Sequence, residues 1–167
     1  MNMSVTTTYA KLSVISITVT AIITAVHHIY REGWVLLIPG ALVVLLPLVL
    51  MRWFRASGSN LALSAYGVLN ALIIVGLGIV DGFLDHVLNA FIVLFAATRG
   101  EAVDRLDRAL RVLPQTPLVG DMLYELTGIL TFVASMIAAY YWYRFMRATL
   151  AERMGGPGQA KSAVSRA

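Results

Sequence analysis

The chain has 167 residues, of which 59% are hydrophobic and 13% charged. A soluble domain of this size needs more polar surface, so the composition indicates a membrane protein, and the length of the apolar runs predicts an all-α one. The absence of cysteine excludes disulfides, thiolate metal sites and covalently attached c-type haem. The net charge of +4 comes from basic residues that flank apolar runs, which fits lipid headgroups and not nucleic acid.

The first two apolar runs predict a hairpin of transmembrane helices. Residues 12–30 are long enough to span a bilayer at ~1.5 Å per residue. We expect this segment to stay in the protein, because it lacks the basic start and the small-residue cleavage pattern of a signal peptide. The connection at 31–33 is short, so residues 34–51 should return antiparallel as the second span. Pro39 and Pro47 lie inside it and should bend it.

The third apolar run, residues 61–97, is too long for one span, because a single helix of this length would measure roughly 55 Å against a ~30 Å hydrocarbon core. We expect a break at Asp81-Gly82, where the aspartate can cap a new helix and the glycine can relieve the backbone. This predicts a third span at 61–80, followed by a helical extension at 83–97 that is re-entrant, interfacial or projecting.

Residues 101–113 predict a short amphipathic surface helix between the third and fourth spans. Its acids and arginines pair four residues apart: Glu101 with Arg105, Asp104 with Arg108, and Asp107 with Arg111. The fourth span should occupy residues 122–143. We expect residues 1–154 to form one domain and the Gly-, Pro- and Ser-containing segment 155–167 to be a disordered tail.

The distribution of lysine and arginine predicts the orientation. Eight of these residues fall on the side of the two termini and five on the other side. Since cytoplasmic loops carry the excess of positive charge, both termini should be cytoplasmic. The sequence therefore predicts an up-down bundle of four transmembrane helices in a bacterial inner membrane, with the amphipathic helix on the outer side.

Three of the predicted spans carry small or polar residues at helical spacing. Such stripes should face other helices and not lipid, and the Gly78-x-x-x-Gly82 spacing should permit close approach of a neighbouring helix. The stripes are Ser13, Ser16, Thr20, Thr24 and His27 or His28 in the first span; Ser64, Gly67, Ala71, Gly78, Asp81, Asp85 and Asn89 in the third; and Glu125, Gly128, Thr131 or Phe132, Ser135 and Ala139 in the fourth.

Each stripe meets a histidine or a carboxylate toward its outward end, and antiparallel packing should bring these ends to one depth. Ionisable residues inside a membrane are costly, so they usually pair or serve a site. Nitrogen and oxygen ligands suit zinc, iron, copper or manganese. We therefore predict a metal site near the outer leaflet, with His27, Asp81, Asp85, His86 and Glu125 as candidate ligands.

Structural interpretations compete with ligation for several of these residues. We expect His28 to hydrogen-bond to water or headgroups, Asp81 has the alternative of a helix cap, and Glu125 that of an ion pair with Arg31. Asp85 and His86 are adjacent in sequence. They are about 100° apart around a helix and cannot both face one centre unless that helix unwinds.

The sequence assigns no enzymatic reaction, because it has neither a glycine-rich phosphate loop nor a Gly-x-Ser-x-Gly elbow. The leading expectation is an accessory, assembly or structural membrane protein that forms a homo-oligomer or joins a partner membrane subunit. One alternative is a proton- or ion-coupled carrier acting as a homo-oligomer. Another is a redox subunit that uses quinone, or haem b held between His27 and His86.

Overall fold

The structure is a computed structural model that describes residues 5–92 and 122–154. Within these two ranges the chain is helical nearly throughout and contains no strand. The elements in chain order are α1 (Val5–Glu32), the one-turn η1 (Trp34–Leu36), α2 (Leu37–Ser57), α3 (Asn60–Leu72), η2 (Ile73–Leu88) and α6 (Met122–Met154). The predicted amphipathic helix at 101–113 and the tail at 155–167 lie outside the described residues.

Four helical stretches are long and apolar enough to cross a membrane: Val5–Glu32, Trp34–Ser57, Asn60–Ile92 and Tyr124–Met154. They coincide with the four predicted apolar runs, and each extends beyond the predicted limits. The extra residues at the helix ends include charged ones such as Arg52, Arg144 and Arg147, so the helices continue into segments that do not suit a hydrocarbon environment.

The predicted break at Asp81-Gly82 is wrong, since one helical stretch continues from Asn60 to Ile92 through α3 and η2. The segment from residue 83 onward is therefore a continuation of the third helix as far as the structure describes it. Gly82 lies against α6, where a Cβ atom would come within 2.8 Å of the backbone nitrogen of Phe132. The glycine thus allows two helices to pack closely and does not interrupt the chain.

Both described connections between helices depend on a glycine with positive φ. Gly33 (φ 86°) closes α1 by donating its N–H to the Ile29 carbonyl at 2.9 Å, and Gly58 (φ 65°) closes α2 in the same way. The Ser59 side chain then caps α3 by accepting from the Ala62 N–H. Gly58 and Ser59 are thus the left-handed C-terminal cap and the serine N-cap that reverse a helical chain in few residues.

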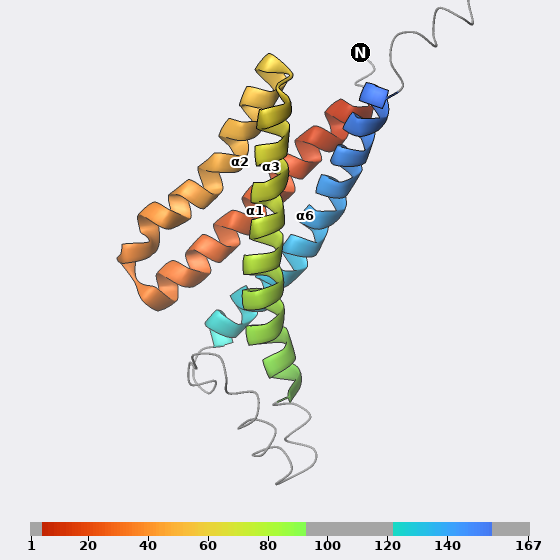
Figure 1. Ribbon diagram of the computed structural model, residues 1–167. Helices are drawn as coiled ribbons and strands as arrows, with labels where there is room; N and C mark the ends of the chain where they lie inside the picture. Colours follow the sequence, from red (N-terminus) through yellow and green to blue (C-terminus); the bar gives the residue numbers. More distant parts are fainter. Residues whose placement is uncertain (1–4, 93–121, 155–167) are drawn as a thin grey trace, which may run out of the picture.

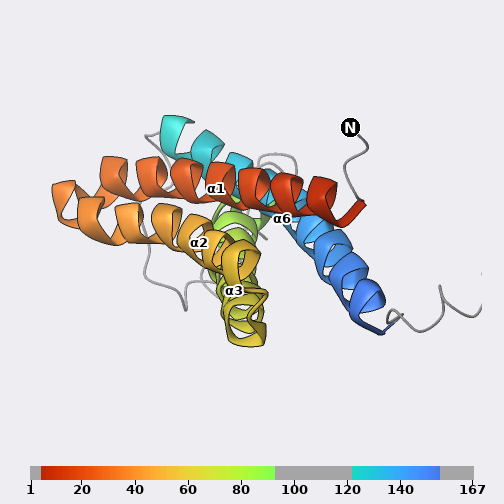
Figure 2. The same cartoon turned by 90° about the horizontal axis from the view of Figure 1, so that it is seen from above.

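The core is formed by α1, α6 and the continuous helix made of α3 and η2, while α2 lies at the periphery. Figure 1 shows α1 and α2 side by side, with α3 crossing them and α6 along the other side of α1, and Figure 2 shows that α6 crosses α1 at an angle. In the most apolar window of α2 only 11% of residues are buried, against 39% in α1. On α2 itself only Pro47 and Met51 are buried, so most of its apolar surface needs an apolar surrounding.

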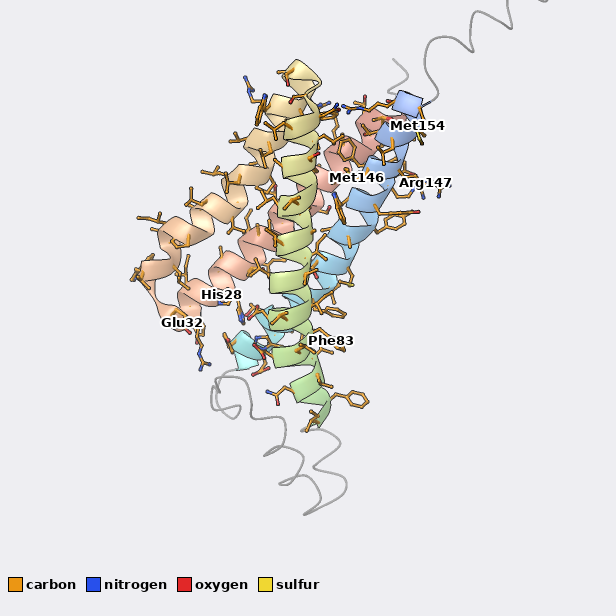
Figure 3. The ribbon with its side chains drawn as sticks, in the orientation of Figure 1. His28, Glu32, Phe83, Met146, Arg147 and Met154 are labelled. Carbon is orange, nitrogen blue, oxygen red and sulfur yellow. The ribbon has the colours of Figure 1, made fainter. Side chains whose placement is uncertain are left out.

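The two ends of the molecule differ in charge. The start of α1, the junction of α2 with α3 and the end of α6 lie together, and we call this the terminal end (Figure 1). Figure 3 places Arg147 and Met154 at the terminal end, and His28 and Glu32 at the opposite one, which we call the histidine end. Among the described residues the terminal end carries Lys11, Arg52, Arg55, Arg144, Arg147, Glu152 and Arg153, whereas the histidine end carries His27, His28, Arg31, Glu32, Asp81, Asp85, His86 and Glu125.

Candidate functional site

One face of α1 leads through the core to the histidine end. Ser13, Thr20 and Thr24 on this face are at most 2% exposed, and His27 follows them at 1%. The hydroxyl groups are satisfied close to their own backbone: Thr20 donates to the Ser16 carbonyl at 3.0 Å, and Thr24 to the Thr20 carbonyl at 2.9 Å. The predicted stripe of the first helix is confirmed as a buried face, and it carries His27 into the interior.

The π-helical hydrogen bonding of η2 brings Asp81 and His86 to one side of that helix. In a π-helix the backbone bonds join residues five apart, so residues five apart lie about one turn above each other. In an α-helix they would be roughly 140° apart. The predicted stripe of the third helix is correct at the buried Gly67 and Gly78 but wrong at Ser64, which is exposed.

Glycines on the two helices make room for these side chains. A Cβ atom on Gly128 of α6 would overlap the imidazole ring of His86, and one on Gly78 would overlap the side chain of Ser135. Together with the contact at Gly82, this confirms the expectation that Gly78-x-x-x-Gly82 permits close approach of another helix. The neighbour is α6, and its close approach brings Glu125 to η2.

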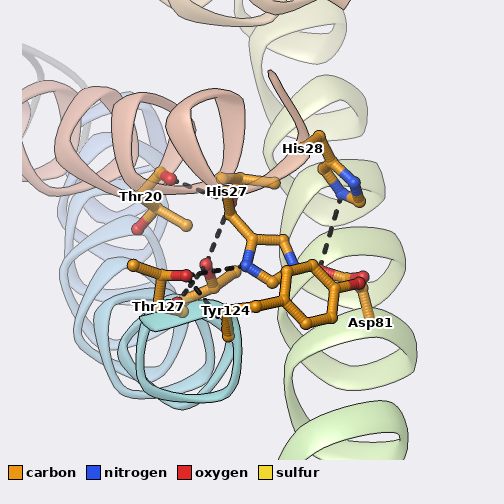
Figure 4. Close-up of polar contacts among 8 residues, drawn as sticks. Thr20, His27, His28, Asp81, Tyr124 and Thr127 are labelled. Atoms are coloured by element: carbon orange, nitrogen blue, oxygen red, sulfur yellow. Dashed lines mark hydrogen bonds and ion pairs between the residues drawn. The ribbon is translucent and has the colours of Figure 1, made fainter. Parts of the chain in front are cut away.

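His27 is held through one ring nitrogen and leaves the other without a partner. Its Nδ1 lies 2.8 Å from the hydroxyl of Thr127 (Figure 4). That hydroxyl donates its proton to the Tyr124 carbonyl at 3.0 Å, so it accepts from the Nδ1–H of His27. The Nε2 lone pair then remains, buried and with no hydrogen-bond partner among the described residues. The ring also stacks on Tyr124, with centroids 4.1 Å apart.

His86 is held in the same way. Its Nδ1 lies 3.0 Å from Oε2 of Glu125, and because a carboxylate only accepts, the ring donates from Nδ1. Its Nε2 is also buried without a partner in the described part of the chain. The His86 ring meets that of His27 edge-on, with centroids 4.8 Å apart. A histidine that donates from Nδ1 to a carboxylate and presents Nε2 has the arrangement typical of metal ligands.

His28 and Asp81 lie beside these two rings. His28 Nε2 is 3.6 Å from Asp81 Oδ2, and that oxygen is buried with no hydrogen-bond partner among the described residues. One potential ligand atom from each of His27, His28 and Asp81 lies within 4.8 Å of the others. A tetrahedral ion with ~2.1 Å bonds needs ligand atoms about 3.4 Å apart, so the ligand atoms would have to approach one another by up to about 1.4 Å.

Only some of the predicted ligands lie close to one another in the structure. Asp81 lies with His27 at the histidine end, and the His86 ring contacts that of His27, while Glu125 hydrogen-bonds to His86. Asp85 is exposed on η2, as expected if this residue and its sequence neighbour His86 cannot face the same centre. His28, expected to face water or headgroups, instead lies at Asp81.

Two contributors from α6 were missed by sequence reasoning. Tyr124 stacks on His27, with the Arg31 guanidinium 4.7 Å from the centre of the tyrosine ring, and Thr127 fixes the tautomer of His27. Both lie four residues before predicted stripe positions, Gly128 and Thr131, so extending that stripe by one turn would have found them. Arg31 therefore lies over Tyr124, while Glu125 is paired with His86.

Comparison with known proteins does not assign the chain to a family. No family model, no curated protein and no solved structure matches it. Its function has to be argued from the chemistry of the site.

Proposed function

We propose that this chain is a small multi-pass membrane protein that binds one divalent transition-metal ion at its histidine end and serves in an accessory, assembly or structural role. The observation that carries the proposal is the pair of buried histidines that present unpartnered Nε2 atoms beside a buried carboxylate oxygen. His27, His28 and Asp81 supply three ligands, and His86 the fourth. Glu125 and Thr127 orient the rings of His86 and His27 from behind.

The free energy of burial supports an ion at this position. Each buried polar atom left without a partner costs about 1–3 kcal/mol. Two imidazole nitrogens and one aspartate oxygen are in this situation. The rings of His27 and His86 are in contact, and potential ligand atoms of His27 and Asp81 lie within 4.8 Å of each other. A divalent ion would bind all three, and its charge would balance those of Asp81 and Glu125.

The ligand set favours zinc, iron, copper or manganese over calcium and magnesium. Three imidazoles and one carboxylate are borderline ligands that suit first-row transition ions, whereas calcium and magnesium prefer oxygen ligands throughout. Since the chain has no cysteine, it offers no soft thiolate for Cu⁺.

Haem b is a weaker candidate for the same residues. Two axial histidines must approach an iron from opposite faces of a porphyrin, with their coordinating nitrogens about 4 Å apart on one line. The rings of His27 and His86 are in edge-to-face contact at 88°, with centroids 4.8 Å apart. This geometry counts against a porphyrin between them, and an absorption spectrum of the purified protein tests the point.

The metal proposal is tested by zinc titration of the protein purified in mild detergent, after chelator treatment. We expect the wild type to bind one ion per chain, Asp81→Asn to lose it, and Asp85→Asn to retain it. Asp85 is the matched control, because it is an exposed acid on the same helix, four residues from Asp81. A wild type that takes up no zinc, iron, copper or manganese, or an Asp85→Asn variant that loses as much affinity as Asp81→Asn, would overturn the proposal.

The membrane arrangement is part of the proposal. We expect the four apolar helices to span a bacterial inner membrane as an up-down bundle, with the basic terminal end in the cytoplasm and the histidine end outside. The cysteine-free sequence allows a direct test with single cysteines. A cysteine at Ser57 should react with an impermeant reagent only from the cytoplasmic side, and one at Glu32 only from outside. The reverse pattern would place the metal site inside.

A further inference from the structure

We propose that a groove between α1 and α2 at the terminal end binds one anionic phospholipid. The groove has a volume of about 560 Å³ and lies far from the histidine cluster along both helices. Its mouth is lined by Lys11, Arg52 and Arg55, and its walls include Val14, Ile15 and Leu48. The groove is therefore cationic at one end and apolar at the other.

The order of these residues along the helices matches the order of groups in a phospholipid. α1 begins at the terminal end, so Lys11 lies nearer that end than Val14 and Ile15. α2 finishes at the same end, so Arg52 and Arg55 lie beyond Leu48. Both helices therefore change from cationic to apolar in the same direction, over roughly 10 Å on α2 at 1.5 Å per residue. A phosphate at the mouth would direct an acyl chain along the apolar walls.

The two arginines of the mouth are available for a phosphate. Within the described ranges neither the Arg52 nor the Arg55 guanidinium takes part in a hydrogen bond or ion pair, and both side chains are exposed. Two further arginines at this end are engaged: Arg153 donates to Asn60 and to the Gly58 carbonyl, and Arg144 donates to Tyr9 and Tyr140. Arginine binds phosphate oxygens in a bidentate manner, which favours a phosphate over a diffuse negative surface.

Nearby acids do not neutralise the mouth. The described acid at this end, Glu152, accepts from Thr6 in a neighbouring hollow of about 310 Å³, and it does not line the groove. Arg55 borders both spaces. The groove is the more cationic of the two, because the hollow also contains Glu152 and the groove contains no acid. An acidic peptide would find cations at the mouth but only apolar side chains below them. A lipid suits both parts.

The test uses the full chain purified in mild detergent, with bound lipid measured by native mass spectrometry and by thermal unfolding. Phosphatidylglycerol should remain bound to the wild type and raise its melting temperature, whereas phosphatidylcholine and inorganic phosphate should do neither. Arg52→Gln/Arg55→Gln should bind phosphatidylglycerol about 30-fold more weakly, since each basic residue near an anionic lipid contributes ~1 kcal/mol. Leu48→Trp should also weaken binding, because it fills the apolar wall and keeps both charges.

Arg147→Gln is the matched control, because Arg147 is exposed at the same end on α6 and does not line the groove. It should bind phosphatidylglycerol as the wild type does, and every variant should keep the wild-type elution profile. The proposal fails if phosphatidylcholine binds equally well, if inorganic phosphate alone reproduces the stabilisation, if Arg147→Gln weakens binding as much as the double variant, or if the groove is covered by a second copy of the chain in place of lipid.

Discussion

Two stretches of the same buried face of α1 differ in whether their polar groups have hydrogen-bond partners. From Ser13 to Thr24 the face carries four buried hydroxyls, and each has a hydrogen-bond partner, as when Ser13 and the Tyr66 hydroxyl meet at 2.7 Å. At His27 the face carries an imidazole whose Nε2 has no partner. In the hydroxyl stretch, from Ser13 to Thr24, every hydroxyl has a partner, whereas in the histidine stretch, at His27, one ring nitrogen can still accept a bond.

The difference arises from what each side chain can reach. Thr20 and Thr24 each donate to the carbonyl one turn earlier, so these hydroxyls are satisfied within their own helix. An imidazole stands too far from its own backbone and needs partners from elsewhere, which Thr127 and Glu125 provide for one nitrogen of each buried ring. A polar stripe of hydroxyl groups in an apolar helix therefore indicates a face that packs against other helices. A stripe that ends in side chains unable to hydrogen-bond to their own backbone indicates a candidate site.

The largest effect should follow from removing a ring of the histidine stretch. His27→Ala should weaken zinc binding by at least about 100-fold, because replacing a residue that only hydrogen-bonds to a metal ligand already lowers metal affinity 10–100-fold. Competition with a chelating dye measures this affinity. If the variant binds zinc as the wild type does, His27 is only a buried packing residue and the contrast between the two stretches disappears.

A smaller effect, on stability, should follow from filling the space beside His86. Gly128→Ala should lower the free energy of unfolding by about 1–3 kcal/mol, because its Cβ would overlap the imidazole ring and separate α6 from η2. Gly76→Ala is the control, since a Cβ there meets nothing within 4 Å. Unfolding in mixed micelles compares the two, and equal stability would show that the close contact between these helices is not required.

Glu125→Gln should sharpen the distinction between ligand and orienting group. The amide can still accept from His86 Nδ1 but carries no charge, so we expect zinc affinity to fall about 10-fold while the fold is kept. A loss as large as that of His27→Ala would identify Glu125 as a direct ligand, as the sequence first indicated.

The smallest effect should be found in the hydroxyl stretch. Thr20→Val keeps the shape of a side chain that is 0% exposed and removes one hydrogen bond to the Ser16 carbonyl, so stability should change by about 0.6 kcal/mol. Zinc affinity should not change at all. A Thr20→Val variant that lost zinc would show that the two stretches form one connected site.

Sequence periodicity predicted the parts of the fold that depend on local properties. The four apolar runs and the buried face of α1 follow from hydropathy and from spacings of three and four. The continuation through Asp81 could not be read in this way, because whether an aspartate caps a helix or faces a histidine depends on where α1 lies. The same holds for His28 and Glu125, whose partners come from helices far away in sequence.

The site draws on α1, η2 and α6, and this has a consequence for biosynthesis. Glu125 follows Asp81 by 44 residues, which a ribosome adds in roughly 2–9 s at 5–20 residues per second. During that interval the histidines of α1 and the aspartate of η2 already exist, but the helix that orients His27 and His86 does not. The histidine end therefore cannot be completed before α6 begins to form, and an ion captured earlier would be held by side chains whose tautomers are still free to change.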